Sequence, residues 1–182
     1  MQVATDHFKH NLFLVGPMGV GKTTIGRMLA QELDLQFIDS DQEIERRAGA
    51  NISWIFDVEG EEGFRVRESA VIEELTARIG VLIATGGGSV LKPENRKWLV
   101  SRGVVVFLDT SVELQLKRTE KDKKRPLLEN TDHELVLSEL RDKRHPIYSE
   151  MADISVFVGD ESGRRAVNSI VRKLKDQALL KD

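Results

Sequence analysis

Gly16-Pro17-Met18-Gly19-Val20-Gly21-Lys22-Thr23 matches the phosphate-binding loop pattern G-x-x-x-x-G-K-[ST]. The apolar run at 11–15 before it predicts a buried strand, and apolar residues at helical spacing after it predict a helix that begins near Lys22. Glycines let such a loop turn tightly and aim its N–H groups at an anion, at the positive end of the helix dipole. A glycine-rich turn without a ligand is the simpler alternative. The strand–turn–helix context favours binding of a nucleoside triphosphate, with Lys22 on the β- and γ-phosphates and the Thr23 hydroxyl on Mg²⁺.

Strand and helix patterns alternate from residue 12 onward. Short apolar runs predict strands at 12–15, 36–38, 81–84, 104–108 and 154–158. Helical spacing, and a proline suited to a first turn, predict helices at 42–47, 53–58, 61–78, from Pro93 onward, and at 112–119, 134–148 and 163–180. This alternation is typical of a single α/β domain with a mostly parallel sheet. Ligands of such sheets bind beyond the carboxyl ends of the strands, so the motifs that follow the strands should converge on one side.

Composition narrows the class of protein. The chain has 182 residues, 40% hydrophobic and 31% charged, which predicts one soluble globular domain. The formal net charge of −3 argues against nucleic acid or an anionic membrane as partner. The sequence contains no cysteine, which excludes disulfides and thiolate metal sites and suits the cytoplasm. The longest apolar run, 104–108, is far too short to span a membrane, and we expect residues 1–10 to be a flexible tail.

Two carboxylates follow the second predicted strand. Asp39 and Asp41 are two residues apart and would share a face if the backbone stays extended. One can hold Mg²⁺ through water, and the other can accept a hydrogen bond or a proton from a substrate hydroxyl. The alternative is that Ser40 or Asp41 only caps the next helix.

Two further features have both a functional and a structural interpretation. The glycine run 86–88 follows a strand and would let a substrate approach bare backbone, although it would also suit a plain flexible loop. Arg65 and Glu68 lie three residues apart on one helix, where they can pair. A partnered arginine can still offer a fork to a carboxylate, but most such pairs are solvated surface pairs.

Basic residues are concentrated between residues 117 and 125, just before Pro126, and the run overlaps the start of the polar segment 122–132. Such a run is usually a solvated face, and it can also mimic a nucleic-acid patch. No aromatic residues are interleaved for base stacking. Beside a phosphate-binding loop, the run is better interpreted as a mobile lid that brings arginine to the transferred phosphoryl group.

Taken together, six motifs resemble one family. They occur in order at 16–23, 39–41, 60–68, 85–88, 124–128 and 144–148. The set is similar to shikimate kinase over about residues 11–175. The resemblance implies transfer of the ATP γ-phosphate to the 3-hydroxyl of shikimate, in the route to aromatic amino acids. It also implies a P-loop three-layer sandwich with strand order 2-3-1-4-5, like nucleoside monophosphate kinases. A substrate-binding region at about 41–70 and a lid at about 120–133 belong to the same pattern.

The resemblance also implies a role for each matching residue. The catalytic residues would be Asp41, as candidate base, with Lys22 and Arg125. ATP would contact Gly19, Val20, Gly21, Lys22, Thr23, Thr24, Arg118, Arg125 and Arg164. Shikimate would contact Asp41, Arg65, Gly87, Gly88 and Arg144. Mg²⁺ would be held by Thr23 and Asp39.

Two rival functions remain open at this point. A different small-molecule kinase, such as a gluconate or nucleoside monophosphate kinase, would share the phosphate-binding loop, although a nucleotide acceptor favours more aromatic residues than this chain has. A regulatory module that binds ATP without turnover would need neither Asp41 nor the basic lid. We expect a cytoplasmic monomer that acts on a small molecule.

Overall fold

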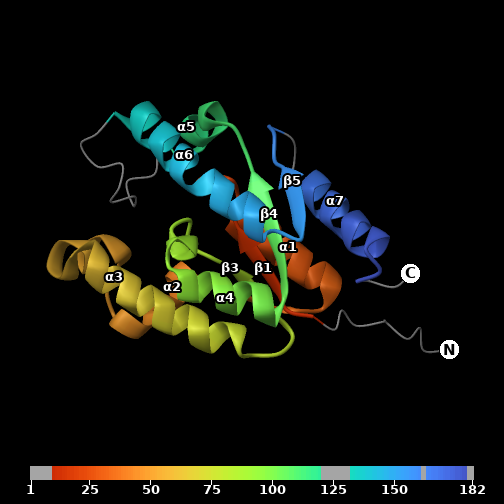
Figure 1. Cartoon of the computed structure of the whole chain (residues 1–182), viewed down its shortest axis with the longest axis horizontal. Helices are drawn as coiled ribbons and strands as arrows, with labels where there is room; N and C mark the ends of the chain where they lie inside the picture. Colours follow the sequence, from red (N-terminus) through yellow and green to blue (C-terminus); the bar gives the residue numbers. More distant parts are fainter. Residues whose placement is uncertain (1–9, 120–131, 161–162, 180–182) are drawn as a thin grey trace.

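The computed structural model describes residues 10–119, 132–160 and 163–179 (Figure 1). In this part of the chain, five parallel strands form one sheet in the order β2-β3-β1-β4-β5, as the resemblance implied. The strands are β1 (Leu12–Val15), β2 (Gln36–Asp39), β3 (Val81–Ala84), β4 (Val104–Asp109) and β5 (Ile154–Phe157). Because all neighbours pair in parallel, every strand presents its carboxyl end to the same edge of the sheet.

Helices cover both faces of the sheet and give the predicted three layers (Figure 1). They are α1 (Lys22–Leu33), α2 (Ser40–Ala48), α3 (Ile52–Thr76), η1 (Ser89–Leu91), α4 (Pro93–Arg102), α5 (Val112–Thr119), α6 (His133–Met151) and α7 (Gly163–Asp176). One core cluster joins α1 and α7 to one face through residues such as Leu29 and Ile170. The other joins α3, α4 and α6 to the opposite face through residues such as Ile72, Leu99 and Tyr148. Burial on both faces explains why β1, β3 and β4 are almost continuously apolar.

Three helix boundaries differ clearly from the sequence prediction, and one predicted break is confirmed. Helix α2 starts at Ser40 rather than residue 42, because Asp39 caps it. Helix α3 is interrupted at Gly60, where the backbone is non-helical with φ 71° and ψ 178°, which matches the two helices predicted at 53–58 and 61–78. Helix α6 continues through Pro146 to Met151, three residues past its predicted end. Helix α7 ends at Asp176 rather than at 180, because Ala178 takes a left-handed conformation with φ 55°.

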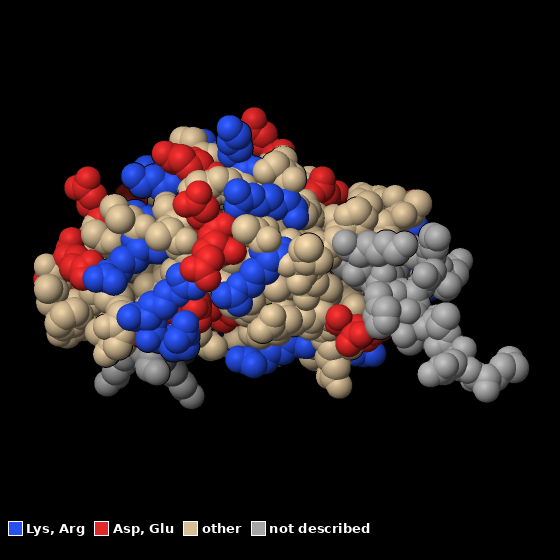
Figure 2. Space-filling model, turned by 90° about the horizontal axis from the view of Figure 1, so that it is seen from below, with Lys and Arg blue, Asp and Glu red and all other residues tan. Residues whose placement is uncertain are grey.

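The surface is mixed in charge on the face seen in Figure 2, where acidic and basic side chains are interspersed. Within the described ranges, no helix is both long and apolar enough to cross a bilayer.

Candidate active site

The phosphate-binding loop connects β1 to α1, as predicted. Gly16, Gly19 and Gly21 have φ values of 147°, 74° and 98°, a region that only glycine adopts without strain. The Lys22 ammonium lies over the loop, where Nζ donates to the carbonyl oxygens of Gly16 at 2.7 Å and Pro17 at 2.9 Å. The loop is therefore shaped for an anion at the start of α1, with the lysine already beside it.

Thr23 and Asp39 meet at the mouth of this loop. The Thr23 hydroxyl donates to Asp39 Oδ2 at 2.7 Å, while Oδ1 accepts the N–H groups of Asp41 at 3.0 Å and Gln42 at 3.2 Å. Asp39 is therefore the cap of α2, so the alternative interpretation, in which Ser40 or Asp41 only caps this helix, is wrong. The expectation of an extended backbone from Asp39 to Asp41 is also wrong, because α2 has already begun at Ser40.

A hydroxyl and a carboxylate oxygen this close fit a magnesium ion that keeps several waters and takes its other ligands from phosphate. Thr23 and Asp39 are the residues that could supply protein ligands in that mode of binding. Over the part of the chain that the structure describes, no three His, Asp or Glu side chains form an all-protein metal site.

The loop opens into a cleft of about 530 Å³, bordered by the start of α2 and the end of β3. Of the predicted nucleotide contacts, it is lined by Gly19, Gly21, Lys22, Thr23, Thr24 and Arg118. Val20 is buried in the core, so only its backbone can serve. Arg118 bridges two chain segments by donating to the carbonyl oxygens of Gly19, at 3.3 Å, and Gly159. Arg164 does not line this cleft and instead pairs with Glu32 on α1 at 2.9 Å. Arg125 lies outside the described residues.

The glycine run 86–88 lies against charged side chains at the other end of the site. A methyl group on Gly86 would lie 2.7 Å from Asp41 Oδ1 and 2.9 Å from Glu68 Oε1. On Gly88 it would collide with the Arg65 guanidinium. On Gly87 it would lie 3.5 Å from Arg144 Nη1. None of the three glycines has a positive φ, so it is the close approach of Asp41, Glu68 and Arg65 that favours glycine at 86 and 88, whereas a methyl group on Gly87 would make only ordinary contacts.

Arg65 and Glu68 form a buried pair beside this run. Arg65 is 7% exposed and Glu68 is 0% exposed, and Arg65 Nη1 donates to Glu68 Oε2 at 2.7 Å. A second carboxylate, from Glu61, accepts from Arg65 Nη2 at 3.0 Å. The alternative that this is a solvated surface pair is therefore wrong, because α3 turns this face toward the core after its break at Gly60.

Glu68 has an unusual acidity. Burial raises the pKa of its carboxyl to about 7, with the Arg65 charge and hydrogen bond opposing the shift and the Asp41 charge adding to it. Its second oxygen, Oε1, has no hydrogen-bond partner among the described residues. The Glu68 carboxyl lies against Gly86 of the glycine run, and its pKa of about 7 is close to neutral pH.

Helix α6 brings a second arginine and a tyrosine to the same place. Arg144 is 5% exposed, and Tyr148 is buried one turn further along. The Tyr148 hydroxyl donates to the Gly87 carbonyl oxygen. Burial raises the pKa of Tyr148 to about 12, so it stays a hydrogen-bond donor. Tyr148 was not predicted from the sequence as a contact of the glycine run, although it stands four residues after Arg144 in the same motif.

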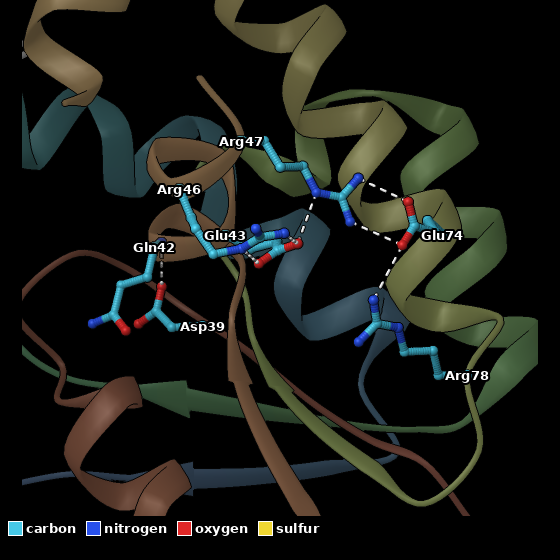
Figure 3. Close-up of polar contacts among 7 residues, drawn as sticks. All are labelled: Asp39, Gln42, Glu43, Arg46, Arg47, Glu74 and Arg78. Atoms are coloured by element: carbon cyan, nitrogen blue, oxygen red, sulfur yellow. Dashed lines mark hydrogen bonds and ion pairs between the residues drawn. The ribbon is translucent and has the colours of Figure 1, made fainter. Parts of the chain in front are cut away.

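Helix α2, which carries Asp41, is tied to α3 by the charged network in Figure 3. Arg47 donates through Nε to Glu43 at 2.7 Å, and through both Nη atoms to Glu74 at 2.8 and 2.9 Å. Arg78, two residues after the end of α3, also donates to Glu74. The hydrogen bond from Arg46, partly opposed by burial, lowers the pKa of Glu43 to about 2. The network therefore stays charged at neutral pH.

The site thus has two ends that meet in one molecule. At one end, loop N–H groups, Lys22 and Thr23 can bind a polyphosphate. At the other, Arg65 and Arg144 flank a glycine run in a position to bind a small carboxylate, with Asp41 beside them.

Comparison with known proteins identifies the family. The family model for shikimate kinase matches residues 18–175. This chain belongs to the shikimate kinase family.

Individual relatives agree with the family match. The chain is 56% identical to the shikimate kinase of Buchnera aphidicola subsp. Acyrthosiphon pisum over 169 residues, which cover 92% of this chain and 98% of that protein. The solved structure of shikimate kinase from Acinetobacter baumannii in complex with shikimate is 47% identical, covers 93% of this chain and 94% of its own, and gives a TM-score of 0.91. A gluconokinase from Sinorhizobium meliloti, at 18% identity and a TM-score of 0.54, shares the fold alone.

Proposed function

We propose that this protein transfers the γ-phosphoryl group of ATP to the 3-hydroxyl of shikimate, giving ADP and shikimate 3-phosphate for aromatic amino acid biosynthesis. The observation that carries the proposal is the meeting of two buried arginines, Arg65 and Arg144, over the glycine run 86–88 beside Asp41. Arginine forks suit the carboxylate of shikimate, and a carboxylate with backbone N–H groups suits its hydroxyls. The relative from Acinetobacter baumannii was solved with shikimate bound, which supports the same acceptor here.

The nucleotide end of the site is supplied by one loop and its neighbours. We infer that the N–H groups of residues 19–24 and the Lys22 ammonium bind the β- and γ-phosphates. Thr23 and Asp39 would hold Mg²⁺, which neutralises phosphate charge when it is bound. Arg118 would lie beside the adenine. For Arg164, an adenine contact would require it to leave Glu32.

The acceptor end positions the reacting hydroxyl. Arg65 and Arg144 would bind the carboxylate of shikimate, while Gly87 and Gly88 would contact its ring substituents. Asp41 would accept the proton of the 3-hydroxyl as the oxygen of that hydroxyl bonds to the γ-phosphorus and the bond to the ADP oxygen breaks. Phosphoryl transfer needs positioning and charge neutralisation more than covalent chemistry. Arg65, already held by Glu68, would contribute to positioning of the acceptor, while Lys22 and Mg²⁺ would neutralise phosphate charge.

Several narrower expectations complete this proposal. Arg125 would reach the transferred phosphoryl group from a lid at about 120–133, nearly all of which is outside the described residues. Residues 41–70 would form the substrate-binding region. We also propose a monomer, since one chain supplies both ends of the site, and a cytoplasmic location, where ATP is available.

One assay separates the three candidate functions. ADP release from ATP would be measured with shikimate, with gluconate, with nucleoside monophosphates and with no acceptor, and the product identified by ³¹P NMR. We expect turnover with shikimate alone and a single phosphate monoester on the 3-oxygen. Turnover with gluconate or with a nucleoside monophosphate, but not with shikimate, would show that the protein is a kinase with that other acceptor. ATP binding without turnover in any mixture would make the protein a nucleotide sensor.

A further inference from the structure

A cluster at the end of β4 has no part in the site described so far. Its centre is Asp109, the last residue of that strand, at the edge of the sheet where the phosphate-binding loop lies. Two side chains from α6 converge on it. Arg141 Nη1 donates to Asp109 Oδ1 at 2.7 Å, and Nη2 donates to Oδ2 at 3.2 Å. His145 Nε2 lies 3.2 Å from the same Oδ2.

The cluster is better held than an ordinary surface ion pair. Arg141 also donates to the Thr110 carbonyl oxygen at 2.7 Å, so its guanidinium is fixed by a side chain and by backbone. The His145 ring stands edge-on against Phe107 at 5.3 Å. Burial alone would raise the pKa of Asp109, but the hydrogen bonds and charge of Arg141, with His145, lower it below its ordinary value. Asp109 is therefore a carboxylate held by two partners from one helix.

These two partners bracket Arg144 in the sequence. Arg141 lies three residues before it and His145 one after it, so all three project from neighbouring positions of α6. Tyr148, one turn beyond Arg144, donates to the Gly87 carbonyl oxygen. A rotation or slide of α6 would move Arg144 and Tyr148 together away from the glycine run.

The other end of this connection is fixed to the nucleotide site. Gly16, at the start of the phosphate-binding loop, lies so close to β4 that a methyl group there would collide with the Leu108 carbonyl oxygen. Asp109 follows Leu108 directly, so its position is set relative to that loop. Because α6 is held by Asp109, its position is also set relative to the phosphate-binding loop.

We propose that Asp109 is a positioning residue for the acceptor site: through Arg141 and His145 it holds α6 in the register that places Arg144 and Tyr148 at Gly87. The inference rests on the proposed binding of the shikimate carboxylate by Arg144. Asp109 itself touches neither substrate in this scheme. Its effect should appear in acceptor binding and leave nucleotide binding nearly unchanged.

The test is Asp109→Asn, which keeps the size of the side chain and removes its charge. Its matched control is Asp142→Asn, the same change at an exposed position of α6. Calorimetry would give the Kd for shikimate and, separately, for ADP. We expect Asp109→Asn to raise the Kd for shikimate about tenfold, equivalent to about 1.4 kcal/mol, with the Kd for ADP within about twofold. The control should change neither value.

A double-mutant cycle with Arg144→Met separates positioning from a general loss of structure. If Asp109 acts through Arg144, Asp109→Asn should have no further effect on the Kd for shikimate once Arg144 is replaced. Full additivity, or an equal rise in both Kd values for Asp109→Asn, would overturn the inference. If Asp109→Asn does not fold, Arg141→Met and His145→Gln each remove one contact, and an unchanged Kd for shikimate in both would overturn it. Failure of the wild-type protein to bind shikimate at all would instead reject the proposed function.

Discussion

Asp41 lies where the two ends of the site meet, within the nucleotide cleft and against Gly86. Asp41→Asn keeps the shape and hydrogen-bonding reach of the side chain but cannot take a proton. We expect kcat to fall by about 10² to 10⁴, the usual contribution of a general base, with the Kd for ADP unchanged. Steady-state kinetics and calorimetry give the two quantities. A kcat near the wild-type value would mean that positioning alone accounts for the rate.

Arg65 and Arg144 are each expected to bind a carboxylate through a planar fork. Arg65→Lys and Arg144→Lys keep the charge and lose the fork, so each should weaken shikimate binding about tenfold or more and ADP binding little. Arg67→Lys is the matched control on α3, since Arg67 pairs with Glu59 at the surface. Calorimetry with shikimate decides the matter, and an unchanged affinity in both variants removes the carboxylate clamp from the proposal.

Glu68 predicts a pH dependence of stability. Its pKa in the folded protein is about 7, above the ordinary value of 4.5 for a glutamate, so the folded state binds the proton more tightly than the unfolded state. Its contribution to stability is complete below about pH 4.5 and is lost as the pH rises through 7, by about 3 kcal/mol in total. Urea unfolding at pH 5 and pH 8 should therefore show a larger fall for the wild type than for Glu68→Gln. Equal falls in both proteins would contradict the shifted pKa.

At the scale of helices and strands, sequence patterns predicted those features that depend on a few neighbouring residues. The positions of the five strands, the start of α4 at Pro93 and the division of α3 near Gly60 follow from apolar runs, a proline and a glycine. The cap of α2 could not be assigned in this way, because Asp39, Ser40 and Asp41 are all good capping residues and only the path of the chain chooses among them.

The charged residues of the site were harder to predict than its glycines. The Arg65–Glu68 spacing is common on helix surfaces, and only the packing of α3 against the sheet makes this pair buried. Asp109 carries no motif, because its partners Arg141 and His145 are more than 30 residues away in sequence and meet it only in the folded protein. Contacts of this kind depend on the topology of the sheet, which local patterns do not encode.

The attachment of α2 to α3 gives a prediction at the same scale. Arg47→Met removes the contacts to Glu43 and Glu74, so α2 loses its ion pair with α3 (Figure 3). The hydrogen bond from the Ile52 N–H to Glu45 still links the two helices. We expect the Kd for shikimate to rise roughly twofold to threefold, the small effect of a surface network, and less at high salt. Arg46→Met is the control, because Arg46 pairs only within α2 among the contacts shown. Equal effects of the two variants would mean that the tie does not position Asp41.

Over the whole molecule, the parallel sheet explains how residues from five separate stretches form one site. The loop after β1, the start of α2 after β2 and the glycine run after β3 all lie at the carboxyl edge of the sheet, where Arg65 and Arg144 reach them from helices on one face. The order of strands predicted from the resemblance was confirmed, and with it the convergence of the motifs. The lid at about 120–133, which we expect to close over the phosphates, remains a prediction from the sequence.

Arg125, in the basic run 117–125, is the residue expected to reach the transferred phosphoryl group from the lid. An arginine aimed at charge that develops during phosphoryl transfer acts mainly in the transition state. Arg125→Ala should therefore lower kcat by about 10³-fold or more, the contribution typical of an arginine in such a position, and raise the Kd for ATP far less. Lys123→Ala, two residues earlier in the same run, is the matched control for charge alone. Since a residue that only binds ATP would weaken kcat/KM and ground-state affinity equally, equal losses would assign Arg125 to nucleotide binding, and the catalytic charge would then have to come from Lys22 and Mg²⁺.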